Sequence, residues 1–113
     1  MKLSLLNILD EYLLVFPNEK ERQNQLKEFL MNHTEKQITD WNNFDGHIVA
    51  SGLVYSTFDK KFLVIYHNDL KMYLYPGGHV DSKDEDILST AKREIIEETG
   101  LRPDPLRWQW RAG

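Results

Sequence analysis

The spacing of the apolar residues changes twice along this chain, and this change most constrains its fold. Apolar residues recur at helical spacing through the first 16 residues and again from 87 to 99, whereas the stretch between them has short Val-, Ile- and Tyr-rich runs. Helical, then β, then helical periodicity predicts an α/β fold. With 113 residues, the chain can bury one modest core and form a single cleft.

Two helices are expected at the N-terminus. The first should end before Pro17, because the residue that precedes a proline disfavours helical backbone. Asn18 is expected to cap the second helix, whose buried stripe would consist of Leu26, Phe29 and Leu30. Residues 1–33 are therefore expected to form a helical extension that packs on the main body, with a dimer contact as the alternative.

A polar connector at residues 34–46 is expected to lead into three strands. The strands are predicted at residues 47–55, 61–66 and 72–75. The third strand should stop at a glycine loop, Pro76-Gly77-Gly78, because Pro and Gly interrupt strands. The next helix should end at Gly100, since a glycine readily adopts the left-handed conformation that follows a helix.

The composition argues against several functions. The net charge is −4, which argues against nucleic-acid and anionic-membrane partners because both need clustered Lys and Arg. The absence of cysteine excludes disulfides, thiolate metal sites and cysteine nucleophiles. No apolar run reaches the roughly 18 residues of a membrane helix, and the first 16 residues lack a signal-peptide cleavage site. A cytoplasmic location is therefore expected.

The helix expected after residue 87 carries three acids that disfavour the bare fold. Glu94 lies three residues before Glu97 and four before Glu98, so the three side chains share one edge of the helix. Like charges about 5–6 Å apart repel by on the order of 3 kcal/mol at an effective dielectric near 20. A bound divalent cation would reverse that balance, and an all-oxygen ligand set favours Mg²⁺ or Mn²⁺.

The neighbouring residues favour chemistry on a phosphate. Gly77 and Gly78 leave the backbone free to approach a ligand, and His79 is a candidate for a phosphate contact. Arg93 lies beside the acids, where it could orient Glu85 or one of the helix acids by a bidentate pair. Because Mg²⁺ usually shares its coordination with substrate phosphates, the set predicts metal-assisted hydrolysis by water. A solvated glutamate-rich helix face is the alternative.

Residues 78–101 resemble the Nudix box, whose pattern is G-x5-E-x7-R-E-U-x-E-E-x-G-U with U an aliphatic residue. The match is complete from Glu85 to Leu101. The position six residues before Glu85 is His79 rather than glycine, and Gly78 lies one residue too early. Either the loop bulges, or Asp84 takes the role of Glu85.

The resemblance implies an α/β/α sandwich with a mixed sheet, and hydrolysis of the diphosphate linkage of a small nucleoside diphosphate derivative. Under it, the metal ligands for Mg²⁺ or Mn²⁺ would be Glu94, Glu97 and Glu98. The catalytic set would comprise Glu85, Arg93, Glu94 and Glu97, and the residues that bind the cofactor or phosphate would be Gly77, Gly78 and His79. A domain that binds metal or nucleotide without turnover is the alternative function.

Nudix domains usually continue well past the box, whereas twelve residues follow Leu101 here. The chain is therefore expected to divide into the extension at 1–33, the first part of a Nudix domain at 34–101 and an atypical tail at 102–113. The C-terminal part of the fold would then be missing, and exposed sheet edges would favour a homodimer formed by strand exchange. The tail, with its three Arg and two Trp, is either a binding arm or a foreign end.

Two sets of residues outside the box are weaker candidates. Three tyrosines at strand spacing could stack on a base, although such residues are more often half-buried in a sheet; they are Tyr66, Tyr73 and Tyr75. His47 and His67 do not have the spacing of metal ligands relative to one another or to His79.

Overall fold

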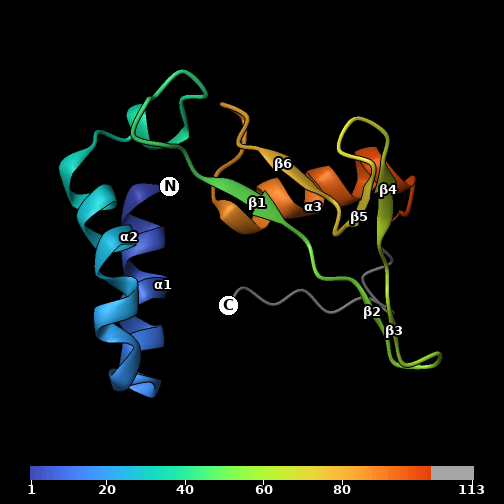
Figure 1. The fold of residues 1–113 in the computed structure, drawn as a ribbon, viewed down its shortest axis with the longest axis horizontal. Helices are drawn as coiled ribbons and strands as arrows, with labels where there is room; N and C mark the ends of the chain where they lie inside the picture. Colours follow the sequence, from blue (N-terminus) through green and yellow to red (C-terminus); the bar gives the residue numbers. More distant parts are fainter. Residues whose placement is uncertain (103–113) are drawn as a thin grey trace.

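A computed structural model describes residues 1–102, so residues 103–113 of the predicted tail lie outside the described part. Figure 1 shows a helical hairpin beside a body in which short strands lie next to a third helix. The helices are α1 (Lys2–Val15), η1 (Pro17–Glu19), α2 (Lys20–Asn32), η2 (Gln37–Thr39) and α3 (Ile87–Thr99). The strands are β1 (Val49–Ser51), β2 (Tyr55–Ser56), β3 (Lys61–Phe62), β4 (Ile65–His67), β5 (Met72–Leu74) and β6 (Gly77–His79). The α/β class is therefore confirmed.

The helical hairpin agrees with the sequence except at the start of α2. α1 ends at Val15, before Pro17, as predicted. The prediction that Asn18 caps α2 is wrong, because Asn18 lies inside the 3₁₀ turn η1 and α2 follows directly from it. Pro17 explains this, since its fixed φ suits the first turn of a helix and lets the chain tighten there.

α1 and α2 pack against one another with one buried residue each, Leu9 and Leu30. Of the stripe predicted for α2, Leu30 is buried and Phe29 is half-buried, whereas Leu26 is 38% exposed. Only the edge of α2 that meets α1 is therefore covered. No helix within residues 1–102 has both the length and the apolar character to cross a membrane.

The polar connector is ordered and fixed to the start of β1. It contains η2, whose Ile38 is fully buried. The backbone N–H of Ile48 donates to the carbonyl of Ile38 at 2.7 Å, and the side-chain amide of Asn43 donates to the carbonyl of Gln37 at 3.0 Å. The connector thus holds a defined position beside the sheet.

The prediction that Gly77 and Gly78 form a loop is wrong, because they begin strand β6. β6 pairs antiparallel with β1, with Ala50 opposite Gly78 and Ser51 opposite Gly77. The lack of side chains allows this close packing: a Cβ on Gly77 would collide with the carbonyl oxygen of Ala50. These glycines therefore allow a strand to pack closely against β1 and α3, and they do not form a turn.

The remaining strands form two short antiparallel hairpins, β2–β3 and β4–β5. The turn of the first hairpin includes Lys60 at φ 56°, and the second turn includes Lys71 at φ 51°. Every strand pair within residues 1–102 is antiparallel, so this part of the chain does not itself form the mixed sheet that the resemblance implies. The strands are also shorter than predicted, and the run from 47 to 55 is interrupted at Gly52.

α3 has well-formed ends. Asp86 caps its N-terminus, where its Oδ1 accepts hydrogen bonds from the backbone N–H of Ser89 at 2.8 Å and from its hydroxyl at 2.7 Å. Gly100 ends the helix at φ 71°, which confirms the prediction for that residue. α3 packs on β1 and β6 and buries Ile95. Figure 1 shows α3 beside β6.

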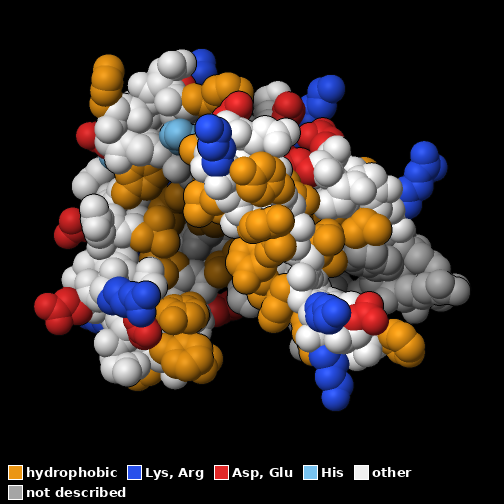
Figure 2. Space-filling view, turned by 45° about the vertical axis from the view of Figure 1, so that its right-hand side comes forward, with side chains coloured by type: hydrophobic (Ala, Val, Ile, Leu, Met, Phe, Trp, Pro, Cys, Tyr) orange, Lys and Arg blue, Asp and Glu red, His pale blue; other side chains and the backbone are white. Residues whose placement is uncertain are grey.

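Much apolar surface remains exposed. Figure 2 shows hydrophobic side chains gathered over the centre of the face that it draws. Phe44 and Phe58 are almost fully exposed, and Tyr73 is 70% exposed. The homodimer by strand exchange stays a prediction.

Candidate functional site

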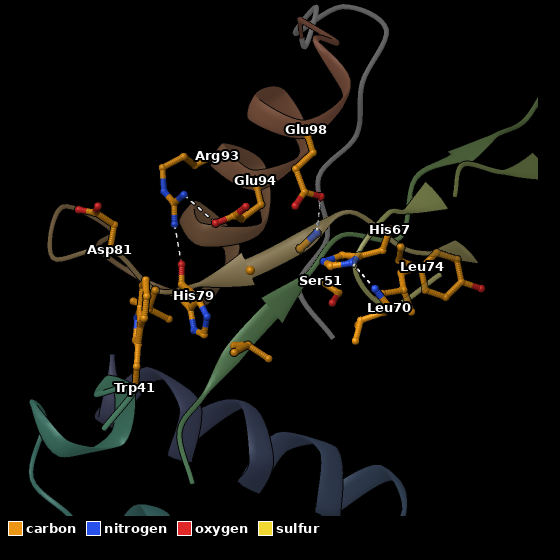
Figure 3. Close-up of a pocket in the computed structure, with 15 residues that line it drawn as sticks. Trp41, Ser51, His67, Leu70, Leu74, His79, Asp81, Arg93, Glu94 and Glu98 are labelled. Atoms are coloured by element: carbon orange, nitrogen blue, oxygen red, sulfur yellow. Dashed lines mark hydrogen bonds and ion pairs between the residues drawn. The ribbon is translucent and has the colours of Figure 1, made fainter. Parts of the chain in front are cut away.

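An open pocket of about 650 Å³ lies where α3 faces the paired strands β1 and β6 (Figure 3). Its wall is completed by the β4–β5 hairpin and by one residue of the connector. Its polar lining residues include Ser51, His67, His79, Asp81, Arg93, Glu94 and Glu98, and its apolar lining residues include Trp41, Val49, Leu70 and Leu74. The pocket therefore joins acids of the predicted site to an apolar wall from other elements.

Arg93 is the centre of the site. Its Nε and Nη2 donate to the carboxylate of Asp84, with the shortest distance 2.9 Å. Its Nη1 donates to Glu94 at 2.8 Å and to Glu97 at 3.1 Å. Its Nη2 also donates to the carbonyl of His79 at 2.8 Å. These bonds occupy all five N–H groups of the guanidinium, so Arg93 holds the other groups in place.

The partner of Arg93 is Asp84, not Glu85. The Asp84 side chain is only 5% exposed. The hydrogen bonds from Arg93 lower the pKa of Asp84 from 3.8 to about 2, against the opposing effect of burial, and the carboxylate raises the pKa of Arg93. Glu85 is exposed, and its side chain makes no hydrogen bond or ion pair within residues 1–102. The sequence left two alternatives open, a bulged loop before Glu85 or Asp84 in the place of Glu85. In the structure Asp84 makes the contact with Arg93.

The glycines of β6 lie against the acids of α3. A Cβ on Gly78 would lie 2.6 Å from Oε1 of Glu94, so the absence of a side chain makes room for that carboxylate, which is 12% exposed. The backbone N–H of Gly77 donates to Oε2 of Glu98 at 3.1 Å. Figure 3 shows both acids directed from α3 towards the strand. Gly77 and Gly78 thus meet the acids through backbone packing and an N–H contact, and their role in binding a cofactor or phosphate stays a prediction.

The donor chemistry of the acids fits a hard divalent cation. Glu94, Glu97 and Glu98 offer only carboxylate oxygens, the ligand type that Mg²⁺ and Mn²⁺ prefer. No three His, Asp or Glu side chains of residues 1–102 converge as a metal cage, however. Arg93 engages two of the three acids and the N–H of Gly77 engages the third. Each of these contacts uses one oxygen of its carboxylate, so a cation would have to bind beside them or displace them.

A stack of three rings lies at one edge of the pocket. The rings of Trp41 and His79 are 4.1 Å apart at 23°, and those of His79 and His47 are 5.0 Å apart at 29°. Nε2 of His47 lies 3.2 Å from Nδ1 of His79 in a hydrogen bond. His67 lies across the pocket, where its Nδ1 accepts from the backbone N–H of Leu70 at 3.1 Å. The histidines therefore serve two different walls.

The sequence interpretation missed Trp41, which lies in a polar connector where no periodicity marks it. Among the tyrosines, Tyr66 and Tyr73 pack edge to face on each other at 5.3 Å and do not line the pocket. Tyr75 does line it. Tyr66 and Tyr75 are 51% and 46% exposed, which is about half-buried, whereas Tyr73 is 70% exposed.

The arrangement can be compared with known proteins. A family model described as NUDIX domain matches residues 45–112. Two curated proteins, from Homo sapiens and Mus musculus, are both named nucleoside diphosphate-linked moiety X motif 6. Each is 40% identical to this chain over 57 residues, which are 49% of this chain and 18% of the relative. The chain thus spans less than a fifth of the length of these relatives. No solved structure matches it.

Proposed function

Since this chain belongs to the NUDIX domain family, we propose that it is a metal-dependent hydrolase of the diphosphate linkage in a nucleoside diphosphate derivative. The observation that carries the proposal is the placement of three acids along one edge of α3: Arg93 contacts Glu94 and Glu97, and Glu94 and Glu98 line the pocket. The pocket volume of about 650 Å³ falls within the roughly 300–1,000 Å³ typical of small-molecule sites. The name of the two relatives also refers to a nucleoside diphosphate.

The three acids of α3 would hold the cation, Mg²⁺ or Mn²⁺. When bound, such a cation would neutralise phosphate charge and make a water molecule more acidic. Glu97 has more freedom to turn than Glu94, because its side chain is 57% exposed against 12% for Glu94. We assign it to metal binding and to help in removing a proton from water, with Glu94 as the inner, more fixed acid.

Arg93 and Asp84 would act as positioning residues. Their bidentate ion pair fixes the guanidinium, which in turn orients the carboxylates of Glu94 and Glu97. The catalytic role assigned to Glu85 stays a prediction. So do the phosphate contact of His79, the sandwich architecture, the division at residues 33 and 101, and the cytoplasmic location.

The test is a phosphate-release assay with Mg²⁺ or Mn²⁺ on ADP-ribose, nucleotide sugars, dinucleoside polyphosphates and nucleoside triphosphates. We expect turnover of at least one class, and a loss of about 10²-fold or more in Glu97→Gln because an acid that assists proton transfer is removed. Glu28→Gln, which removes an exposed carboxylate on α2, is the matched control. Full turnover by Glu97→Gln would contradict the site assignment.

A second candidate is a domain that binds metal or nucleotide without turnover. It is favoured by one observation: within residues 1–102 the acids are held by Arg93 and Gly77 and do not converge. This candidate predicts that Mn²⁺ or a nucleotide raises the melting temperature while no substrate of the panel releases phosphate. Measurable hydrolysis lost in Glu97→Gln would exclude it.

A further inference from the structure

Trp41 combines exposure with a fixed position at the pocket. Its side chain is 64% exposed, yet its ring stacks on His79 and lines the same pocket as Glu94 and Glu98. Figure 3 shows the ring at the opposite end of the pocket from the β4–β5 hairpin. Trp41 also precedes the residues that the family model matches, which begin at 45. A large apolar ring left open beside a polar cluster is suited to a ligand that has both an aromatic and an anionic part.

The connector holds this ring in place before any ligand binds. On one side of Trp41, Oδ1 of Asp40 accepts from the backbone N–H of Asn42 at 2.9 Å, and the Asp40 carbonyl accepts from the N–H of Asn43 at 3.1 Å. Further back, Ile38 is fully buried and bonded to the start of β1. An aromatic group held in this way loses little conformational entropy when it binds.

His79 links the ring to the acids. Its side chain stacks on Trp41, while its carbonyl accepts from Arg93 at 2.8 Å. Nδ1 of His79 is bonded to His47, which fixes the imidazole plane. One residue therefore sets the distance between the aromatic wall and the Arg93-centred cluster. The tyrosines of β4 and β5 offer no equivalent, because Tyr66 and Tyr73 pack on each other outside the pocket.

We propose that Trp41 is the base-binding wall of this pocket, on which the nucleobase of the substrate stacks while its phosphates lie towards the acids of α3. This inference rests on the proposed function and adds to it the part of the substrate that selects binding. Stacking tolerates any base, since every base has a π-face. The pocket should therefore favour nucleotides over base-free diphosphates without strong preference among bases.

Calorimetry with two non-hydrolysable probes tests the inference, both with Mg²⁺: the α,β-methylene analogue of ADP, and methylenediphosphonate, which lacks base and ribose. The wild-type chain should bind the ADP analogue more tightly. Trp41→Ala should weaken that binding by about 5- to 100-fold, the range expected for loss of one base–aromatic stack, and should change methylenediphosphonate binding by less than about twofold. Trp41→Phe should keep most of the preference.

Phe44→Ala is the matched control, because Phe44 is a fully exposed aromatic residue of the same connector that does not line the pocket. Trp41→Leu guards against misfolding of the alanine variant, since leucine can still cover His79 but has no π-face. A role of Trp41 in packing alone would lower the melting temperature and leave the ratio of the two affinities unchanged. Equal binding of both probes, no binding of either, or an unchanged ratio in Trp41→Ala and Trp41→Leu would overturn the inference.

The phosphate-release assay separates this inference from the proposed function. No release from any substrate, together with a Trp41-dependent preference for the ADP analogue, would refute the hydrolase and leave the base-binding wall standing. Release that is lost in Glu97→Gln, with no Trp41-dependent preference, would refute the wall and leave the hydrolase standing.

Discussion

Arg93 grips Asp84 with two of its nitrogens, Nε at 3.1 Å from Oδ1 and Nη2 at 2.9 Å from Oδ2, and so ties the segment before α3 to the middle of that helix. Paired charged hydrogen bonds of this kind are stronger than neutral ones and fix the plane of the guanidinium. The same guanidinium then reaches Glu94, Glu97 and the carbonyl of His79. Asp84 lies outside α3 and, through Arg93, therefore determines the orientation of Glu94 and Glu97.

Asp84→Asn should lower the free energy of unfolding by about 1–3 kcal/mol, because it weakens charged hydrogen bonds to a largely covered carboxylate. Glu85→Gln removes the same charge one residue along, from an exposed side chain without a hydrogen bond or ion pair in the described part, and should change the free energy of unfolding by no more than about 0.5 kcal/mol. Urea unfolding of both variants measures the difference. A larger loss of unfolding free energy in Glu85→Gln than in Asp84→Asn would show that Glu85, not Asp84, is the partner of Arg93.

The stabilisation by Asp84 should depend on pH in the acid range. Its pKa is about 2 in the folded chain and 3.8 ordinarily, so the folded state binds a proton less readily than the unfolded state. The contribution is therefore complete above about pH 4 and is lost as the pH falls towards 2. The stability difference between wild type and Asp84→Asn should shrink from pH 6 to pH 3 in urea unfolding. A constant difference across that range would contradict the ion pair.

Two glycine substitutions should separate stability from activity. In Gly78→Ala the new methyl meets the end of the Glu94 side chain, which can turn away at a cost of about 1 kcal/mol, so turnover should fall while the fold persists. In Gly77→Ala the methyl meets the carbonyl of Ala50 in β1, and the stability should fall by about 1–3 kcal/mol. Phosphate release and urea unfolding distinguish the two. Full turnover by Gly78→Ala would show that the position of Glu94 is unimportant.

The stabilisation by the His33–Asp45 contact at the end of α2 should depend on pH in the opposite direction. Hydrogen bonds to the Phe29 carbonyl and then to Asp45 raise the pKa of His33 above 6.5. A raised pKa means that this contribution to stability is complete below pH 6.5 and is lost as the pH rises through the folded-state value. Asp45→Asn should therefore lower the melting temperature more at pH 5.5 than at pH 8.5.

Asp69→Asn, at an exposed position of the β4–β5 turn, is the control for Asp45→Asn and should have the same small effect at both pH values. Equal destabilisation by Asp45→Asn at pH 5.5 and pH 8.5 would mean that His33 carries no charge in that contact.

The sequence predicted the elements well where local physics decides them. Pro17 ended α1 and Gly100 ended α3, because both residues restrict or permit backbone angles irrespective of the surroundings. It failed at Gly77 and Gly78, which punctuate a chain in isolation but here pair with β1. Both strands of that pair pack on α3, and no local pattern contains such contacts. The same holds for the short strands, whose lengths are set by packing.

The site was predictable only in its helix. The spacing of Arg93 and the acids within α3 places them on one edge. In the structure Arg93 contacts Glu94 and Glu97, whereas Glu98 accepts from the N–H of Gly77. The partner before the helix was ambiguous by one residue, since the path of the loop decides whether position 84 or 85 faces Arg93. Trp41 reaches the pocket, and His47 stacks on His79 beside it, through the tertiary fold alone, so nothing in their neighbours' sequence could mark them.

The ordered connector also limits how this pocket can be transplanted. A graft of residues 45–112 into another scaffold would carry every carboxylate of α3 but would leave behind the indole at position 41. It would also leave the N–H of Ile48 without the carbonyl of Ile38 that anchors it at 2.7 Å. The minimal portable unit therefore starts at η2 (Gln37–Thr39), eight residues before the family match begins.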